Sequence, residues 1–259
     1  MSDTAARIKP LGLIGSVVFF GVPSLVVTLS LFVFLPWLVR QGASQFITFT
    51  LAFGGPLALM LVAALVAYRL EGHPWTWPAF RDRMRLGRLS GRGWLLTALL
   101  CVLAAPIAGA PLISAAADLL SGVHIYSPPK AVTDFMGSLV SGGNVFLGIP
   151  LHDNWGFLLY YLVFLFVCNI LGEELWWRGY ILPRQELAFG RHAWIANGVL
   201  WVLFHAFYHW TLNRPVEMLP DALFLAFVCQ KERSTWPGII GHFIENLGIP
   251  LLILKGILS

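Results

Sequence analysis

An uncharged apolar segment runs from Trp155 to Leu171 (WGFLLYYLVFLFVCNIL), and the glutamates Glu173 and Glu174 follow it after a single glycine. Lipid offers no partner to unpaired backbone groups, so a long apolar segment crosses a bilayer as a helix of roughly 20 residues. A soluble protein carries about 25% charged residues, whereas this chain of 259 residues carries 12% and has a mean hydropathy of +0.75. The sequence therefore predicts an all-α, polytopic transmembrane helical bundle.

The predicted bundle has about seven spans, within a range of six to eight, because that many segments approach the length a crossing requires. These segments cover about 11–39, 46–69, 94–120, 155 to the glutamate pair, 193–212, 219–230 and 236–255. A basic loop at 70–93 and a loop rich in Gly, Ser and Pro at 121–153 lie between spans. No long hydrophilic stretch interrupts the array. Residues 1–259 are therefore predicted to form a single membrane domain, in which 1–154 support the helices of 155–250.

The basic residues indicate how the bundle is oriented. They are concentrated in the 81–94 stretch (RDRMRLGRLSGRGW), which the positive-inside rule assigns to the cytoplasm. Alternation of the spans then places further basic residues on the same side: Arg178, Arg184, Arg191, Lys231 and Arg233. Each opposite loop has a single Lys or Arg. We expect a multi-pass protein of the plasma membrane with a cytoplasmic N-terminus, in contact with membrane lipids. The net charge of +4 follows from this topology and does not indicate a nucleic-acid-binding surface.

Ionisable side chains are concentrated in the second half of the chain. A charged residue at the centre of a span costs about 2.5–3.5 kcal/mol on insertion scales, so such residues face a bundle interior, a partner or a wet cavity. Asp221 lies near the end of a predicted span, where we expect it to be solvated. The candidates in the second half are Glu173, Glu174, Arg178, His205, His209, His242 and Glu245, and Asn246 joins them as a neutral polar group. This set indicates that the second half of the chain carries the functional groups of the bundle.

The glutamate pair divides into two predicted roles. Glu174 and Arg178 are spaced i, i+4 and are expected to pair on one helix face. Glu173 is rotated by about 100° from Glu174 and faces elsewhere, so it is left free to act. The alternative is a charged helix end at the membrane interface, where Glu and Arg are readily tolerated.

The histidines have a similar helical spacing. His205 and His209 (i, i+4) could present two imidazoles to a metal, but Ala206 replaces the glutamate of an HExxH motif. His209 is expected at the membrane interface among aromatic residues, while a buried core histidine is the alternative for His205. His242 and Asn246 share one helix face, with Glu245 pointing aside; a packing pair is the alternative for these two.

Three helices thus carry the parts of a hydrolytic site. A carboxylate can activate water, and imidazole and amide groups can donate hydrogen bonds to a developing oxyanion.

The segment EELWWRGY resembles the EExxxR signature of the CAAX-prenyl-protease and bacteriocin-processing (CPBP) intramembrane proteases. HFIEN at 242–246 matches the HxxxN signature of the same family. The FxxxH signature is matched at His205 with Trp201 in place of Phe. Because Trp is also a bulky aromatic residue, we expect this exchange not to affect the chemistry. The resemblance covers about residues 155–250.

The resemblance implies an intramembrane endopeptidase that cleaves a membrane-associated or lipidated protein or peptide. It implies that Glu173 activates water with the help of His205, and that Glu174 and Arg178 hold the helix geometry and local charge. His242 and Asn246 would complete the site and stabilise the oxyanion. In members that act on prenylated proteins the site opens toward the cytosol, which agrees with the orientation expected from the basic loops.

The family includes members described as metalloproteases and as glutamate-based proteases. Zinc is the alternative cofactor here, with Glu173, His205 and His242 as ligands, but these come from separate helices, so metal-free water activation is favoured. Two other classes remain open: a non-proteolytic binding scaffold for bacteriocin immunity or protein recruitment, and a transporter with a proton relay. A transporter would predict inverted repeats, and none is visible in the sequence.

Overall fold

The computed structural model describes residues 8–108, 110–141 and 144–259 and confirms the predicted all-α class. The first half contains α1 (Leu13–Leu29), α2 (Leu35–Arg40), α3 (Gln45–Phe49), α4 (Gly55–Leu70), α5 (Trp77–Arg83), α6 (Gly91–Ala108), α7 (Pro111–Leu120) and α8 (Lys130–Gly137). The second half contains α9 (Trp155–Phe164), α10 (Gly172–Glu174), α11 (Leu182–Phe189), α12 (Ala193–Phe204), α13 (Asn213–Glu232), α14 (Trp236–Glu245) and α15 (Gly248–Leu258).

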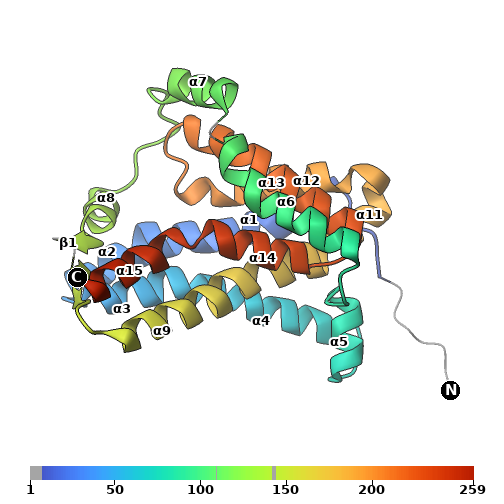
Figure 1. The fold of residues 1–259 in the computed structure, drawn as a ribbon, viewed down its shortest axis with the longest axis horizontal. Helices are drawn as coiled ribbons and strands as arrows, with labels where there is room; N and C mark the ends of the chain where they lie inside the picture. The colour runs from blue at the N-terminus through green and yellow to red at the C-terminus, as the bar shows by residue number, and fades with distance from the viewer. Residues whose placement is uncertain (1–7, 109, 142–143) are drawn as a thin grey trace.

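The predicted loop 121–153 is partly ordered into regular structure. Besides α8 it contains the two-residue strands β1 (Val140–Ser141), β2 (Val145–Phe146) and β3 (Ile149–Pro150), paired antiparallel in that order. The pairing places Val140 opposite Phe146 and Val145 opposite Pro150. This sheet is small and lies at one end of the bundle (Figure 1).

Three helical stretches of the described chain are long and apolar enough to cross a membrane: Leu13–Arg40, Gln45–Leu70 and Trp155–Phe207. A fourth results if α14 and α15, which bend by 46° at their junction, form one span. The first two match the spans predicted at 11–39 and 46–69. The third holds both the fourth and the fifth predicted spans, because the chain reverses near Gly190, whose φ of 58° a glycine adopts without strain.

The remaining predicted spans are shorter in the structure. The segment 94–120 is divided between α6 and α7, since Pro111 begins a new helix there. The segment 219–230 is part of α13, which carries Glu217, Asp221 and Lys231 and is less apolar than the long stretches. The count of seven crossings therefore stays a prediction.

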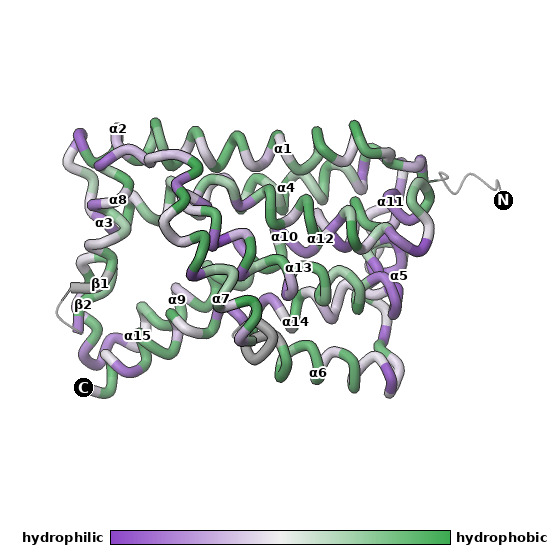
Figure 2. Tube along the Cα trace, turned by 90° about the horizontal axis from the view of Figure 1, so that it is seen from above, coloured by the Kyte–Doolittle hydropathy of each residue, from purple (hydrophilic) through white to green (hydrophobic). Residues whose placement is uncertain are grey.

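The two ends of the bundle differ in what they contain. Figures 1 and 2 show α5, α11 and the N-terminal side of α1 at one end. The turn between α2 and α3, the helix α8, the small sheet and the C-terminus lie at the other end. We call these the basic end and the distal end. Ten basic residues lie in or next to the parts of α4, α5, α6, α11, α12 and α13 that meet at the basic end: Arg69, Arg81, Arg83, Arg85, Arg88, Arg92, Arg184, Arg191, Lys231 and Arg233.

Candidate active site

The EExxxR segment lies in a helix with two wide turns. Glu173 and Glu174 form part of α10, between π-helical stretches at Leu165–Leu171 and Leu175–Ile181. Such wide turns are frequent at functional sites. The helix passes very close to α4, since a Cβ atom on Gly172 would lie 2.6 Å from the backbone oxygen of Leu57. Glycine at 172 is thus required for this helix to pack where it does.

Glu174 is buried and contacts two basic side chains. Its Oε1 atom accepts hydrogen bonds from Nη1 of Arg178 at 2.9 Å and from Nδ1 of His242 at 3.0 Å. The side chains of Glu174 and Arg178 are both 0% exposed, which confirms the predicted pairing of these two residues. A carboxylate buried this completely is stable only when it is paired. Glu174 thereby connects the EExxxR helix to α14, which carries His242.

Gly238 makes room for the other oxygen of Glu174. A Cβ atom at position 238 would lie 2.2 Å from Oε2 of Glu174 and 3.1 Å from Sγ of Cys229. We predict that Gly238→Ala destabilises the protein by about 1–3 kcal/mol, the usual cost of overpacking, as measured by thermal unfolding in detergent. Gly248→Ala is the matched control, because position 248 has no atom within 4 Å and lies in a helix, where alanine is favoured over glycine by roughly 0.5–1 kcal/mol. Equal stability of the two variants would contradict this packing.

Glu173 has a different environment. It is 3% exposed, and its Oε2 atom accepts a hydrogen bond from Nε1 of Trp201 at 2.7 Å and a longer one from Nε1 of Trp177 at 3.4 Å. The Nε2 atom of His205 lies 3.9 Å from the same oxygen. The Nδ1 atom of His205 contacts the carbonyl oxygen of Trp201 at 2.8 Å. A carbonyl only accepts, so Nδ1 carries a proton, and in the neutral ring Nε2 then faces Glu173 as an acceptor.

Trp201 stands at the centre of the site. Besides donating to Glu173, its ring lies 4.3 Å from the guanidinium carbon of Arg178 and 5.2 Å from the rings of both His205 and His242. The exchange of Phe for Trp at this position adds a hydrogen bond to Glu173, because only Trp supplies the indole N–H. The effect of the exchange on the chemistry stays a prediction, which the Trp201→Phe variant described below tests.

The last of the predicted residues is Asn246. Its Nδ2 atom donates to the carbonyl oxygen of His242 at 2.9 Å, one turn back at the end of α14. The structure thus brings all six predicted site residues together from three segments of the chain. Their catalytic roles stay predictions.

A cavity of about 940 Å³ reaches this group of residues. Glu173, His205, His242 and Asn246 line it, whereas Glu174 and Arg178 do not. Its apolar wall includes residues of the first half of the chain, among them Val27, Phe53 and Leu57. Of the two adjacent glutamates, Glu173 alone faces space that a substrate and water could occupy.

The sequence did not predict the positions of several polar residues in the cavity and next to it. Asp221, predicted to be solvated at a span end, and Glu245, predicted to point aside, both line it. Asn169, one helical turn before Glu173, also lines it, and its Oδ1 atom is buried with no hydrogen-bond partner. His209, predicted at the membrane interface, is 4% exposed and packs 6.1 Å from the ring of His205.

The proposed zinc ligands do not form a metal-binding group. Among the described residues, no set of three or more His, Cys, Asp or Glu side chains is arranged to hold a metal ion. Glu173 and His205 approach each other, but Nδ1 of His242 is bonded to Glu174.

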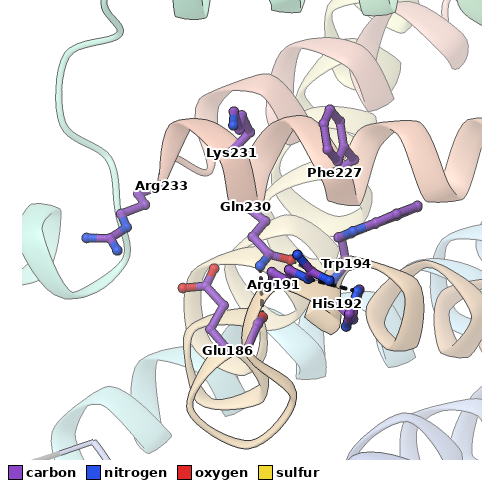
Figure 3. A pocket seen from close by; sticks show the side chains of 9 residues that line it. Glu186, Arg191, His192, Trp194, Phe227, Gln230, Lys231 and Arg233 are labelled. Atoms are coloured by element: carbon purple, nitrogen blue, oxygen red, sulfur yellow. Dashed lines mark hydrogen bonds between the residues drawn. The ribbon is translucent and has the colours of Figure 1, made fainter.

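A second, smaller cavity of about 570 Å³ lies at the basic end (Figure 3). Arg191, His192 and Trp194 face it from the start of α12 and the turn before it, and Phe227 and Lys231 lie on α13 across from them. Gln230 donates to the carbonyl oxygen of Gly190 and accepts from the amide of Trp194, which holds the turn against α13. This cavity contains none of the six predicted site residues.

Taken together, the fold and the site define an integral membrane protein whose apolar helices enclose a cavity lined by carboxylate and imidazole groups. Residues 154–248 match the family model described as type II CAAX prenyl endopeptidase Rce1-like, so this segment is a domain of that family. The matched segment holds all six predicted site residues. Membership of this family indicates a peptidase. No curated protein and no solved structure matches the chain.

Proposed function

We propose that this protein is an intramembrane endopeptidase in which Glu173 activates a water molecule for attack on a peptide bond. The observation that carries the proposal is the pair formed by Oε2 of Glu173 and Nε2 of His205. These two acceptors are 3.9 Å apart beside the large cavity. A gap of this size is too long for a direct hydrogen bond and suits a bridging water.

A water molecule between these atoms donates one hydrogen to the carboxylate and the other to the imidazole. Its oxygen lone pair is then directed into the cavity. The fixed hydrogen bonds from Trp201 to Glu173 and from His205 to the Trp201 carbonyl hold both acceptors in place. Such preorganisation lowers the cost of reaching the transition state.

In the first step the water oxygen bonds to the carbonyl carbon of the substrate while one water proton passes to Glu173. The resulting oxyanion accepts a hydrogen bond from the second N–H of the Asn246 amide, and His242 completes the site beside it. In the second step the C–N bond breaks and Glu173 returns the proton to the leaving amine. Glu174 contributes by holding Nδ1 of His242, which leaves Nε2 as the ring nitrogen available to the cavity.

The substrate we propose is a peptide segment of a membrane-associated or lipidated protein. The cavity volume and its largely apolar wall suit an extended chain with apolar side chains. The family's name refers to CAAX prenyl substrates. We further propose a single plasma-membrane domain of about seven spans with the N-terminus and the basic end in the cytoplasm.

The test compares protein termini by mass spectrometry in cells that express the wild type or Glu173→Ala at matched levels. Termini that appear with the wild type and vanish with the variant support a protease and identify its substrate. Identical termini, together with a cellular phenotype that survives the substitution, would instead favour a binding scaffold.

Trp201→Phe should lower the catalytic rate by roughly ten- to a hundredfold. A hydrogen bond to a charged group contributes about 1.5–3 kcal/mol, and each 1.4 kcal/mol is about a factor of ten in rate. The aromatic ring remains in the variant, so the packing on Arg178 is largely kept. The measurement is kcat/KM of the purified proteins on one substrate. Trp177→Phe is the control, because the 3.4 Å contact it removes is longer and its loss should have the smaller effect.

A further inference from the structure

We infer that the active-site cavity opens on the extracytoplasmic side of the membrane, so that the substrate is a peptide segment presented there. This inference rests on the proposed function and on the cytoplasmic assignment of the basic end. It differs from the expectation that the site faces the cytosol. A cytoplasmic basic end and a cytosol-facing site cannot both hold for this fold, because the cavity and the basic end lie on opposite sides of the site.

The rim of the cavity is formed by segments away from the basic end. His124, Ser127, Pro128, Thr133 and Met136 line it from the chain that leads from α7 into α8. Figures 1 and 2 place α8 at the distal end, with the α2–α3 turn and the C-terminus. Ser127 and Thr133 are exposed as well as lining the cavity. The cavity therefore reaches the surface on this side.

The segment between α12 and α13 forms the adjoining part of the rim. Trp210, Thr211 and Arg214 line the cavity there. Two backbone hydrogen bonds join this segment to the chain after α7, from Ile125 to Trp210 at 2.9 Å and from Leu212 to Val123 at 2.9 Å. The hydroxyl of Tyr126 also donates to the carbonyl oxygen of Ala206. These contacts define one continuous mouth rather than two unrelated surface loops.

The path from Glu173 toward the basic end is closed by packing. Every residue from Gly172 to Pro183 is buried. Trp177 is 0% exposed and its ring stacks on that of Phe20 at 4.1 Å. The cavity ends at Glu173 and is not lined by any of the residues from Trp176 to Pro183.

Ion pairs connect the elements of the basic end, on the far side of these buried residues. The guanidinium of Arg83, 2% exposed, pairs with Glu71 at 2.6 Å and donates to the carbonyl oxygen of Gly179 at 3.0 Å. Arg184 joins Glu71 at 3.3 Å, and Arg85 pairs with Glu186 at 2.6 Å. The cavity shown in Figure 3 opens at this end, but its lining residues are separate from those of the active site.

The charge distribution assigns the two ends to the two sides of the membrane. The basic end carries the ten Lys and Arg residues named above. By contrast, the distal elements α2, α8 and α15 carry Arg40, Lys130 and Lys255, and Arg214 lies on the rim of the cavity. This asymmetry is the pattern that retains a loop in the cytoplasm. The mouth at Ser127 and Thr133 is then extracytoplasmic. A membrane-anchored protein whose cleaved segment lies next to its anchor on that side is the substrate class that fits.

Thiol labelling tests the side of access. Cys101, Cys168 and Cys229 are replaced by serine or alanine in the full chain, and Ser127→Cys or Arg88→Cys is added; both positions are exposed. Cells are treated with a charged, membrane-impermeant maleimide before or after permeabilisation. The Ser127→Cys variant should be labelled in intact cells and the Arg88→Cys variant only after permeabilisation. The reverse pattern overturns the inference. If the Ser127→Cys variant does not fold, labelling of a Thr133→Cys variant reports on the same mouth of the cavity.

Failure of this inference and failure of the proposed function give different results. Labelling needs no proteolysis, so adding Glu173→Gln to either variant should leave the labelling pattern unchanged. If the pattern is as expected while no protein termini depend on Glu173, the proposed protease activity is wrong and the orientation stands. If the pattern is reversed while cleavage depends on Glu173, the activity stands and the substrate is cytosolic. In an active chain, labelling at 127 in intact cells should also block cleavage.

Discussion

Glu173→Gln is expected to lower peptide-bond cleavage by at least about a hundredfold, the lower bound for loss of a general base, while the protein stays folded. Glutamine has nearly the same shape, and its amide oxygen can still accept the hydrogen bond that Trp201 donates at 2.7 Å. It cannot take a proton from water. The measurement is kcat on a substrate identified by its termini, together with thermal unfolding of the purified variant.

The neighbouring residue supplies the control for this prediction. Glu174→Gln removes a carboxylate that does not reach the cavity and that binds Arg178 and His242. It should reduce stability more than Glu173→Gln does, because it strands the buried guanidinium. Wild-type turnover by Glu173→Gln would refute the assignment of Glu173 as the base, whatever the result for its neighbour.

Helical spacing was sufficient to predict the contacts that lie within one helix. Glu174 and Arg178 are one turn apart, so their pairing follows from helix geometry alone. The grouping of Glu173, His205 and His242 could be anticipated because polar groups in lipid face one another or a cavity. The 100° rotation between adjacent helix positions also separated the cavity-facing glutamate from the buried one.

The contacts between helices could not be predicted from the sequence. The indole N–H of Trp201 reaches Glu173 because α12 crosses the EExxxR helix at that level, and an aromatic residue in an apolar span gives no sign of this. Asp221 and Glu245 join the cavity because α13 is one helix from Asn213 onward and α14 ends at Glu245 before the 46° bend. Hydropathy does not give the number of crossings for the same reason: proline breaks and polar faces shorten helices that hydropathy alone would extend.

The side of the membrane on which the cavity opens also depends on tertiary contacts that the sequence does not show. Basic loops indicate which end of the bundle is cytoplasmic, but no loop sequence states which end a cavity reaches. The polar network of Glu71, Arg83 and Arg184 at the basic end comes from three separate elements. Read along the chain, these residues are ordinary loop charges. Only their packing against Tyr180 and Gly179 shows that they close the end at which they lie.

Arg178→Ala is expected to destabilise the protein by about 3–5 kcal/mol, the cost of breaking a buried ion pair by removing one partner. The guanidinium is 0% exposed, donates to Glu174 and covers the ring of Trp201. Without it the Glu174 carboxylate is buried with His242 as its remaining partner. The double variant Arg178→Ala/Glu174→Gln should recover part of the loss, since a neutral amide is cheaper to bury than an unpaired carboxylate. Thermal and chemical unfolding of the three proteins in one detergent gives the comparison. An unchanged melting temperature for Arg178→Ala would show that the ion pair between Arg178 and Glu174 contributes nothing to the stability of the protein. A double variant less stable than Arg178→Ala would show that the cavity left by the arginine side chain, rather than the stranded charge, dominates the cost.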